Sequence, residues 1–330
     1  MKNEPDYLNI CIACDDNYAP HGGAVIASVM ANKNEDDAPR FFILSDKLSE
    51  PVKQQFHEMA TQWNFPLSIQ ECTDDLFQGL RTWRGKYNAY YRLAIHRFLP
   101  KEISKVLYLD CDTVAATSLS PLFHTDVSDK YAAVVAMTAE SAFTTHDFPY
   151  FSSGMMLLNL EKYRNDNLEQ KAIEIGTRRF SEIEFPDQDI LNEVFAGNVV
   201  FLPPKWHIVQ FPLDAQYARI SGPPLPFPVE ELRDAIADPG IVHFNSRPWQ
   251  AFCTHPLRDL YWKYIRLTPF YRETKKEYYH HWMSGLYQRY FRINLSKKNV
   301  HIKLFGVDLF SWKARAKNAE ATVHPCSKGK

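Results

Sequence analysis

The sequence predicts an α/β protein with a mostly parallel central sheet flanked by helices. Short apolar runs alternate with helix-like segments of about a dozen residues, which is the pattern of βαβ units. Acidic loops follow two of these runs, and in such sheets ligands bind beyond the carboxyl ends of the strands. With 330 residues, of which 45% are hydrophobic, the chain is long enough to bury a full core.

Each expected strand is a short apolar run bounded by polar or turn residues. The expected strands are residues 8–13, 40–44, 67–69, 106–109, 155–160 and 241–244. The helix after the second strand can be capped by Ser49 and has Pro51 in its first turn, and Pro100 ends a later helix. The expected helices are residues 21–32, the segment after Ser49, and residues 87–98, 162–180 and 187–195.

Two carboxylates, Asp110 and Asp112, directly follow the strand expected at 106–109. Side chains two residues apart on an extended chain project to the same side, roughly 7 Å apart. Two hard oxygen donors at this spacing can share a divalent cation, which in turn can hold a diphosphate. A turn at the end of a strand is the alternative interpretation of the same residues.

A second acidic loop, Asp15-Asp16-Asn17, follows the first expected strand. Because the carboxyl ends of parallel strands meet at one edge of a sheet, this loop and the Asp110–Asp112 pair are expected at the same edge. Taken alone, the loop is more typical of a turn and a helix cap.

Six motifs follow one another along the chain: Ala13–Tyr18, Tyr90–Leu93, Val106–Asp112, Gly154–Leu160, Asp187–Asn192 and His243–Trp249. In this order they resemble the motifs of the retaining glycosyltransferases of family 8. Among these, the chain is most similar to bacterial lipopolysaccharide and lipo-oligosaccharide galactosyl- and glucosyltransferases. The resemblance covers roughly residues 7–250 and implies the GT-A fold, a nucleotide-binding sheet with helices on both faces.

The resemblance implies a site for a UDP-sugar donor and a divalent metal. Asp110, Asp112 and His243 correspond to the metal ligands of the family, a set that suits Mn²⁺ with Mg²⁺ as a weaker substitute. Arg247 stands where the family has a lysine, in a shorter loop, and can bind the diphosphate. Residues expected to hold the nucleotide-sugar are Ala13, Asp15, Asn17, Tyr18, Arg92, Asp110, Cys111, Asp112, Ser152, Asp187, Gln188, His243 and Arg247.

The resemblance also assigns the chemistry to Asp187, Gln188 and Asp189. Retention requires either a carboxylate nucleophile or attack on the face from which the leaving group departs. Gln188 corresponds to the residue beneath the anomeric carbon, and because an amide is a poor nucleophile, front-face substitution is favoured. Asp187 would bind sugar hydroxyls, and Asp189 would support them or act as a reserve nucleophile. Ser152 stands where the family commonly has an asparagine that touches the donor sugar, which leaves the donor hexose open.

The C-terminal part of the chain differs in charge from the rest. Residues 1–255 carry 22 Lys and Arg against 34 Asp and Glu, whereas residues 256–330 carry 16 against 5. We therefore expect a GT-A catalytic domain at 1–254 and a helical, basic and aromatic extension at 255–330. The extension either attaches to an anionic membrane surface or packs as a cap with a solvated basic face. Nucleic acid is a poor partner because the acidic part of the chain would face it.

The composition favours a cytoplasmic protein, with attachment to the inner face of the bacterial inner membrane as a further expectation. The six cysteines form no zinc pattern, and neither a transmembrane run nor a signal-peptide core is seen. The expected activity is transfer of galactose or glucose from UDP to a glycan or glycolipid acceptor such as lipopolysaccharide core. The alternatives are transfer of another sugar such as GlcNAc, an inactive nucleotide-sugar-binding protein, and a nucleotidyltransferase, whose phosphate loop is missing near the first strand.

Overall fold

The computed structural model describes residues 5–82, 85–137, 148–209, 227–296, 299–304 and 307–313, with side chains up to residue 284. The chain divides into two compact units. The first comprises residues 1–248 and 254–271, and the second comprises residues 249–253 and 272–330. Every residue expected at the nucleotide-sugar site belongs to the first unit.

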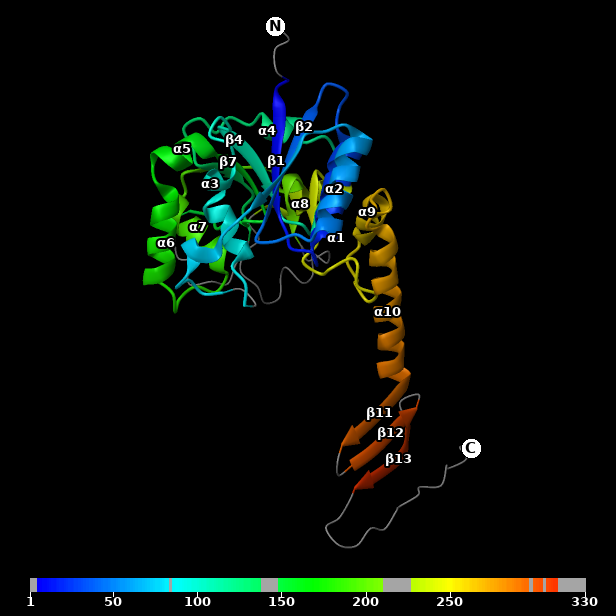
Figure 1. Ribbon diagram of the computed structural model, residues 1–330. Helices are drawn as coiled ribbons and strands as arrows, with labels where there is room; N and C mark the ends of the chain where they lie inside the picture. Colours follow the sequence, from blue (N-terminus) through cyan, green and yellow to red (C-terminus); the bar gives the residue numbers. More distant parts are fainter. Residues whose placement is uncertain are drawn as a thin grey trace. The chain divides into compact units, whose positions relative to one another are not determined.

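A seven-stranded sheet forms the centre of the first unit (Figure 1). Its strand order is β3-β2-β1-β4-β7-β6-β8, and β7 alone runs against the others, so the predicted mostly parallel α/β fold is confirmed. The strands are β1 (Tyr7–Ala13), β2 (Ala38–Ser45), β3 (Leu67–Glu71), β4 (Lys105–Leu109), β6 (Ala132–Val134), β7 (Met155–Asn159) and β8 (Val199–Phe201).

Helices cover both faces of this sheet. Successive strand residues point to opposite faces, so both faces carry apolar side chains that helices bury. On one face, α1 (Ala19–Asn32) and α2 (Glu50–Trp63) cover residues such as Ile12. On the other face, residues such as Tyr108 share one apolar core with α6 and α7. The helices of that side are α3 (Ile95–Phe98), α5 (Leu160–Asn165), α6 (Leu168–Arg178) and α7 (Pro186–Phe195).

A small second sheet in the same unit brings a distant segment to the acidic pair. Strand β10 (Ile241–His243) lies between β5 (Thr113–Ala115) and β9 (Ile208–Val209). The antiparallel register of β10 and β5 sets His243 opposite Thr113, the residue after Asp112. The remaining elements of the unit are α4 (Ser120–Phe123), α8 (Val229–Ala237), α9 (Arg258–Ile265), which packs on α1, and the 3₁₀ turns Asp74–Phe77, Asn88–Leu93 and Pro204–Trp206.

Two expected helices differ from the structure. Residues 87–98 form the 3₁₀ turn Asn88–Leu93 followed by α3, because four consecutive side chains, Tyr90 to Leu93, are all buried and cannot share one helix face. Residues 162–180 are divided between α5 and α6 at Asn167, whose backbone is left-handed with φ of 52°. Asparagine tolerates this conformation better than most residues, which ends α5 there.

The second unit begins helically and then changes to strands. Helix α10 (Tyr271–Tyr290) precedes an antiparallel sheet of β11 (Phe291–Ser296), β12 (Asn299–Leu304) and β13 (Val307–Lys313). The extension expected to be helical is therefore helical in α10. Strands β11 to β13 differ from that expectation, and in them apolar and polar residues alternate with the period of a strand. None of the helices in the described ranges is long and apolar enough to cross a membrane.

Candidate active site

The acidic pair and His243 meet at the carboxyl end of β4. One potential ligand atom from each of Asp110, Asp112 and His243 lies within 4.8 Å of the other two. His243 Nε2 is 2.9 Å from Asp112 Oδ1 and 3.9 Å from Asp110 Oδ2. The Phe244 amide also donates to the Asp112 carbonyl at 2.7 Å, so backbone pairing holds His243 beside the pair. The three residues predicted as metal ligands are thus brought together.

The charge at this cluster favours a cation. Burial alone would lower the pKa of His243, but the neighbouring Asp112 and Asp110 carboxylates outweigh burial and raise it. A cation is therefore stabilised here, whether it is a proton on the imidazole or a metal ion among the three side chains. Two carboxylate oxygens and one imidazole nitrogen are ligands of the kind that Mn²⁺ accepts, so the residues fit such an ion.

Gly154, the residue before β7, has no side chain, and the cluster occupies the space that a side chain would fill. Its carbonyl accepts from the Asp110 amide at 2.8 Å. A Cβ atom at this position would lie 2.5 Å from His243 Cε1 and 2.9 Å from Asp110 Oδ2. Both distances are shorter than real Cβ contacts, so any side chain here displaces two of the three residues.

Gly154→Ala is expected to weaken Mn²⁺ binding at least about tenfold, because it moves two ligands away from each other. Isothermal titration of the protein with Mn²⁺ measures the effect. Gly23→Ala is the matched control, since its Cβ would meet only Phe270 and Met59 and should lower stability without changing metal affinity. Equal Mn²⁺ affinity for Gly154→Ala and the unaltered chain would contradict the prediction.

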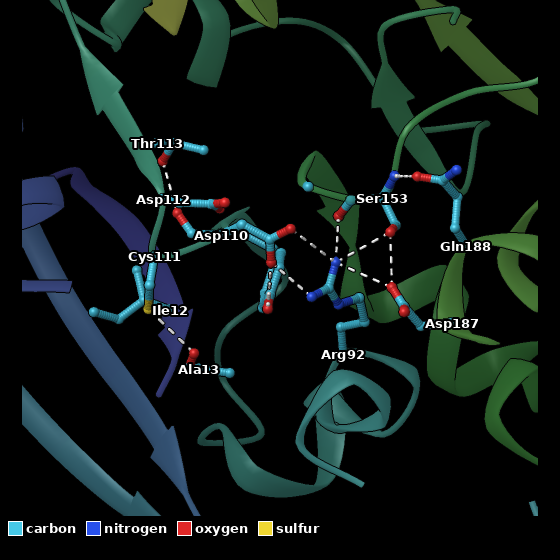
Figure 2. A network of polar contacts seen from close by, with 12 residues as sticks. Ile12, Ala13, Arg92, Asp110, Cys111, Asp112, Thr113, Ser153, Asp187 and Gln188 are labelled. Atoms are coloured by element: carbon cyan, nitrogen blue, oxygen red, sulfur yellow. Dashed lines mark hydrogen bonds and ion pairs between the residues drawn. The ribbon is translucent and has the colours of Figure 1, made fainter. Parts of the chain in front are cut away.

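Arg92 connects the acidic pair to the start of α7 (Figure 2). Its side chain is 8% exposed and pairs with Asp110 at 2.6 Å and with Asp187 at 3.1 Å. It also donates to the Ser153 carbonyl at 2.9 Å, and its guanidinium lies 4.4 Å from the centre of the Tyr108 ring. Burial alone would lower the pKa of Arg92, but the two carboxylates raise it, so the residue is a permanent buried cation. Because its side chain is buried, Arg92 does not form an exposed ion pair of the kind found on helix surfaces.

The amide of Gln188 is fixed at both ends. Its Oε1 accepts from the Ser153 amide at 3.1 Å, and its Nε2 donates to the Tyr150 hydroxyl at 3.0 Å. The Ser153 hydroxyl in turn donates to Asp187 at 2.7 Å. Burial raises the pKa of Asp187, an effect that Arg92 opposes. The oxygen of the Gln188 amide therefore points to the Ser153 backbone, in the turn that precedes β7 (Figure 2).

Asp189 is fully buried beneath this arrangement. Its carboxylate accepts from the Tyr150 hydroxyl at 2.6 Å and from the amides of Glu184 and Phe185 at 2.8 and 2.9 Å. A carboxylate with these donors and no exposure cannot reach a sugar carbon without leaving them. Asp189 thus contacts Tyr150, and its role in supporting the sugar-binding residues or as a reserve nucleophile stays a prediction.

The first loop lies beside the acidic pair, as expected from the sheet. The Cys111 thiol contacts the Ala13 carbonyl at 3.1 Å (Figure 2). Asp15 accepts from the Tyr18 amide at 3.0 Å and also pairs with Lys86, so its side chain closes a turn just before α1, whose N-cap is Tyr18. Asn17 is exposed. The loop therefore forms the predicted turn and also borders the site.

Tyr18, the residue expected to stack on the base, is half-buried in front of α1. Its ring meets His21 edge-on at 5.6 Å between centroids. His21 shares a 2.8 Å hydrogen bond with the Tyr261 hydroxyl of α9, and burial lowers its pKa to about 3. A neutral histidine anchored to α9 thus supports the aromatic ring.

The remaining expected residues differ in how they border the site. Ser152 is buried, and its hydroxyl faces the Gly154 amide at 3.4 Å. Arg247 is half-buried and has a left-handed backbone with φ of 50°, a conformation that favours glycine. Three residues not predicted from the sequence lie in contact with predicted ones: Ser153, Tyr150 and His207, which lies 2.9 Å from His243. Of these, Ser153 carried a signal in the sequence, because it lies between the expected site residue Ser152 and Gly154, the first residue of a motif.

Known proteins share this arrangement at the level of fold and family. A lipopolysaccharide 1,2-glucosyltransferase of Escherichia coli is 24% identical over 298 residues, which cover 84% of this chain and 85% of the relative. General stress protein A of Bacillus subtilis is 24% identical over 274 residues, covering 80% and 94%. The crystal structure of galactosyltransferase LgtC in complex with donor and acceptor sugar analogs has a TM-score of 0.68 at 22% identity, covering 81% and 99%, which shows the same fold.

The similarity extends to a whole family. Residues 9–253, most of the chain, match the sequence profile of glycosyl transferase family 8. These residues include most of β1, the acidic pair, Gln188 and His243. The chain belongs to glycosyl transferase family 8 and is a glycosyltransferase.

Proposed function

We propose that this glycosyltransferase moves a hexose from a UDP-sugar to a glycan acceptor and retains the anomeric configuration of the donor. The observation that carries the proposal is the cluster of Asp110, Asp112 and His243 beside Gln188 and Arg92 in a member of family 8. Galactose and glucose are the favoured sugars, because one similar protein is a glucosyltransferase and another a galactosyltransferase.

The donor is held from two sides in this proposal. Ala13, Asp15, Asn17 and Tyr18 receive the uridine, since a carboxylate accepts from uracil N–H and an aromatic ring stacks on the base. Asp110, Asp112 and His243 would hold a divalent metal, Mn²⁺ or more weakly Mg²⁺, which when bound would supply positive charge to the diphosphate. Arg247 adds a second positive charge to the diphosphate, and Cys111 and Ser152 line the same edge.

The transfer proceeds on one face of the sugar. The bond between the anomeric carbon and the diphosphate oxygen breaks, and both electrons remain on the diphosphate. The acceptor hydroxyl attacks the same face, and its proton passes to a phosphate oxygen. The Gln188 carbonyl oxygen stabilises the positive charge on the anomeric carbon, while Asp187 binds sugar hydroxyls. Tyr150 and Ser153 support this role because they already hold the amide in one orientation.

Gln188→Ala is expected to slow transfer far more than it weakens UDP binding, because the amide acts where charge develops. A loss of about 100-fold in kcat is expected, since removing one pre-oriented group that stabilises transition-state charge costs this much. Steady-state kinetics and calorimetry with UDP measure the two effects. Gln170→Ala, on the exposed side of α6, is the control and should change neither. Equal losses in kcat and in UDP affinity would count against the assigned role.

A donor screen tests the proposed function. UDP-glucose, UDP-galactose and UDP-GlcNAc are incubated with the protein and Mn²⁺, and UDP release is measured. We expect hydrolysis of one hexose donor and less of UDP-GlcNAc. Binding of all three without hydrolysis, and without transfer to lipopolysaccharide core oligosaccharide, would favour the inactive nucleotide-sugar-binding protein instead.

The acceptor in this proposal is lipopolysaccharide core or a related surface glycan, which one similar protein glucosylates. A lipid-linked acceptor is met at a membrane surface, and residues 291–330 carry nine Lys and Arg against two Asp and Glu. Anionic lipid attracts such a segment at about 1 kcal/mol for each well-placed cation. These charges support peripheral attachment at the inner face of the inner membrane.

Lys297→Glu with Lys298→Glu is expected to weaken binding to vesicles that contain anionic lipid and to leave UDP-sugar hydrolysis unchanged. Binding by the unaltered chain should fall as salt rises, because screening acts over about 8 Å at physiological ionic strength. Vesicle co-sedimentation is the measurement. The matched control, Lys101→Glu with Lys171→Glu, makes the same change of charge on exposed residues of the first unit. Equal binding by both double variants, or none by the unaltered chain, would remove the membrane role.

A further inference from the structure

His207 lies directly behind the histidine of the acidic cluster. It follows the 3₁₀ turn Pro204–Trp206 and precedes β9, which runs parallel to β10 with Val209 opposite His243. Its side chain is buried, with the residue 1% exposed. Its Nε2 is 2.9 Å from His243 Nδ1, and the two rings stack with centroids 5.0 Å apart and planes at 29°. In the described part of the chain, His207 is therefore the hydrogen-bond partner of the His243 ring nitrogen that faces away from the carboxylates.

The two ring nitrogens of His243 have different tasks. Nε2 faces Asp112 and is the nitrogen available to a metal, for which it must present a lone pair. A neutral imidazole with a free Nε2 carries its proton on Nδ1, and that proton must be donated to an acceptor. His207 Nε2 is at the required distance. A neutral imidazole has one accepting nitrogen, and His207 can present it at Nε2.

The other nitrogen of His207, Nδ1, is buried and has no hydrogen-bond partner among the described residues. The contact with His243 is therefore the hydrogen bond that offsets the burial of this polar ring in the described part of the chain. A phenylalanine at position 207 would bury no polar atom of its own, but it would leave His243 Nδ1 without this partner.

We propose that His207 is a positioning residue that accepts the Nδ1 proton of His243 and thereby holds Nε2 toward the metal. The inference rests on the proposed metal site and adds a residue to it. Outer partners of metal-bound histidines fix the tautomer and the ring orientation, and their loss typically weakens metal binding about 10- to 100-fold.

Two substitutions separate the hydrogen bond from the stacking. His207→Phe keeps the aromatic ring beside His243 and removes the acceptor, whereas the side-chain oxygen of His207→Gln can lie near the place of Nε2. With the full chain and no sugar present, Mn²⁺ affinity is measured by calorimetry and by electron paramagnetic resonance. We expect His207→Phe to bind Mn²⁺ about 10- to 100-fold more weakly and His207→Gln to recover most of that loss. His96→Phe is the control, since His96 stacks on Tyr163 and pairs with Glu169.

A spectroscopic measurement on the unaltered chain does not depend on whether a variant folds. In the Zn²⁺-loaded protein, long-range proton–nitrogen NMR should show the proton of His243 on Nδ1 and the proton of His207 on Nδ1. A proton on His207 Nε2, or Mn²⁺ affinity in folded His207→Phe equal to that of the unaltered chain, would overturn this inference alone. Failure of the unaltered chain to bind any divalent metal would overturn it together with the proposed metal site.

Discussion

Asp110→Asn and Asp112→Asn are each expected to reduce sugar transfer at least about a hundredfold. Each change removes a negative charge from a cluster whose three ligand atoms lie within 4.8 Å of one another. An amide oxygen remains, but it is a weaker ligand, and the amide nitrogen cannot bind a cation. Steady-state transfer with saturating donor and Mn²⁺ measures the loss, and calorimetry should show weaker metal-dependent binding of UDP.

Asp129→Asn provides the matched control for both variants. Asp129 is an exposed carboxylate of the same unit, and it forms a 3.6 Å ion pair with Lys130 on the surface. Its substitution should leave transfer and UDP binding unchanged. Undiminished turnover by EDTA-treated protein would contradict the metal requirement, and the assignment of Asp110 and Asp112 would then be wrong.

Arg92→Met is expected to abolish most transfer and to destabilise the protein by about 3–5 kcal/mol. The substitution leaves Asp187 buried without the cation that pairs with it at 3.1 Å, and Asp110 loses its 2.6 Å contact. Because Arg92 is the group that opposes the raised pKa of Asp187, that pKa should rise further. Chemical denaturation measures the stability, and transfer assays on the folded fraction measure activity.

Two further variants complete this experiment. Arg92→Lys tests whether the charge alone is sufficient, and Arg97→Met removes an arginine outside the site. Lysine keeps the positive charge but cannot reach Asp110, Asp187 and Ser153 at once, so a partial loss is expected. Arg97 is 53% exposed, and its partner Glu169 keeps a second contact with His96 at 3.2 Å, so Arg97→Met should cost less stability than Arg92→Met. A stability for Arg92→Met equal to that of Arg97→Met would show that the buried network contributes nothing.

The parts of the site that could be predicted are those determined by local spacing and by the sheet. Asp110 and Asp112 stand two apart at the end of an apolar run, and the rule for the carboxyl ends of parallel strands brings the Ala13–Tyr18 loop to the same edge. His243 required the resemblance to a family, because neither spacing nor periodicity connects it to residues more than a hundred positions earlier.

The parts that could not be predicted depend on contacts between distant segments. His207 meets His243 only because β9 pairs with β10, and β9 is two residues long, too short for a periodic pattern. From the sequence, Tyr150 cannot be distinguished from other aromatic residues of the core. Its hydroxyl contacts Gln188 and Asp189 only because α7 packs beside it. Residues 88–93 form a 3₁₀ turn instead of the expected helix, because the burial of their side chains in the folded protein outweighs their helix propensity.

The anomeric configuration of the first product tests the central claim most directly. An α-linked UDP-hexose identified by the donor screen is incubated with an oligosaccharide acceptor, and proton NMR records the H-1 coupling of the new linkage before any further reaction. The orientation of Gln188 and the membership in family 8 predict an α-linkage, formed with retention. A β-linkage in the initial product would contradict front-face transfer at Gln188 and with it the proposed mechanism.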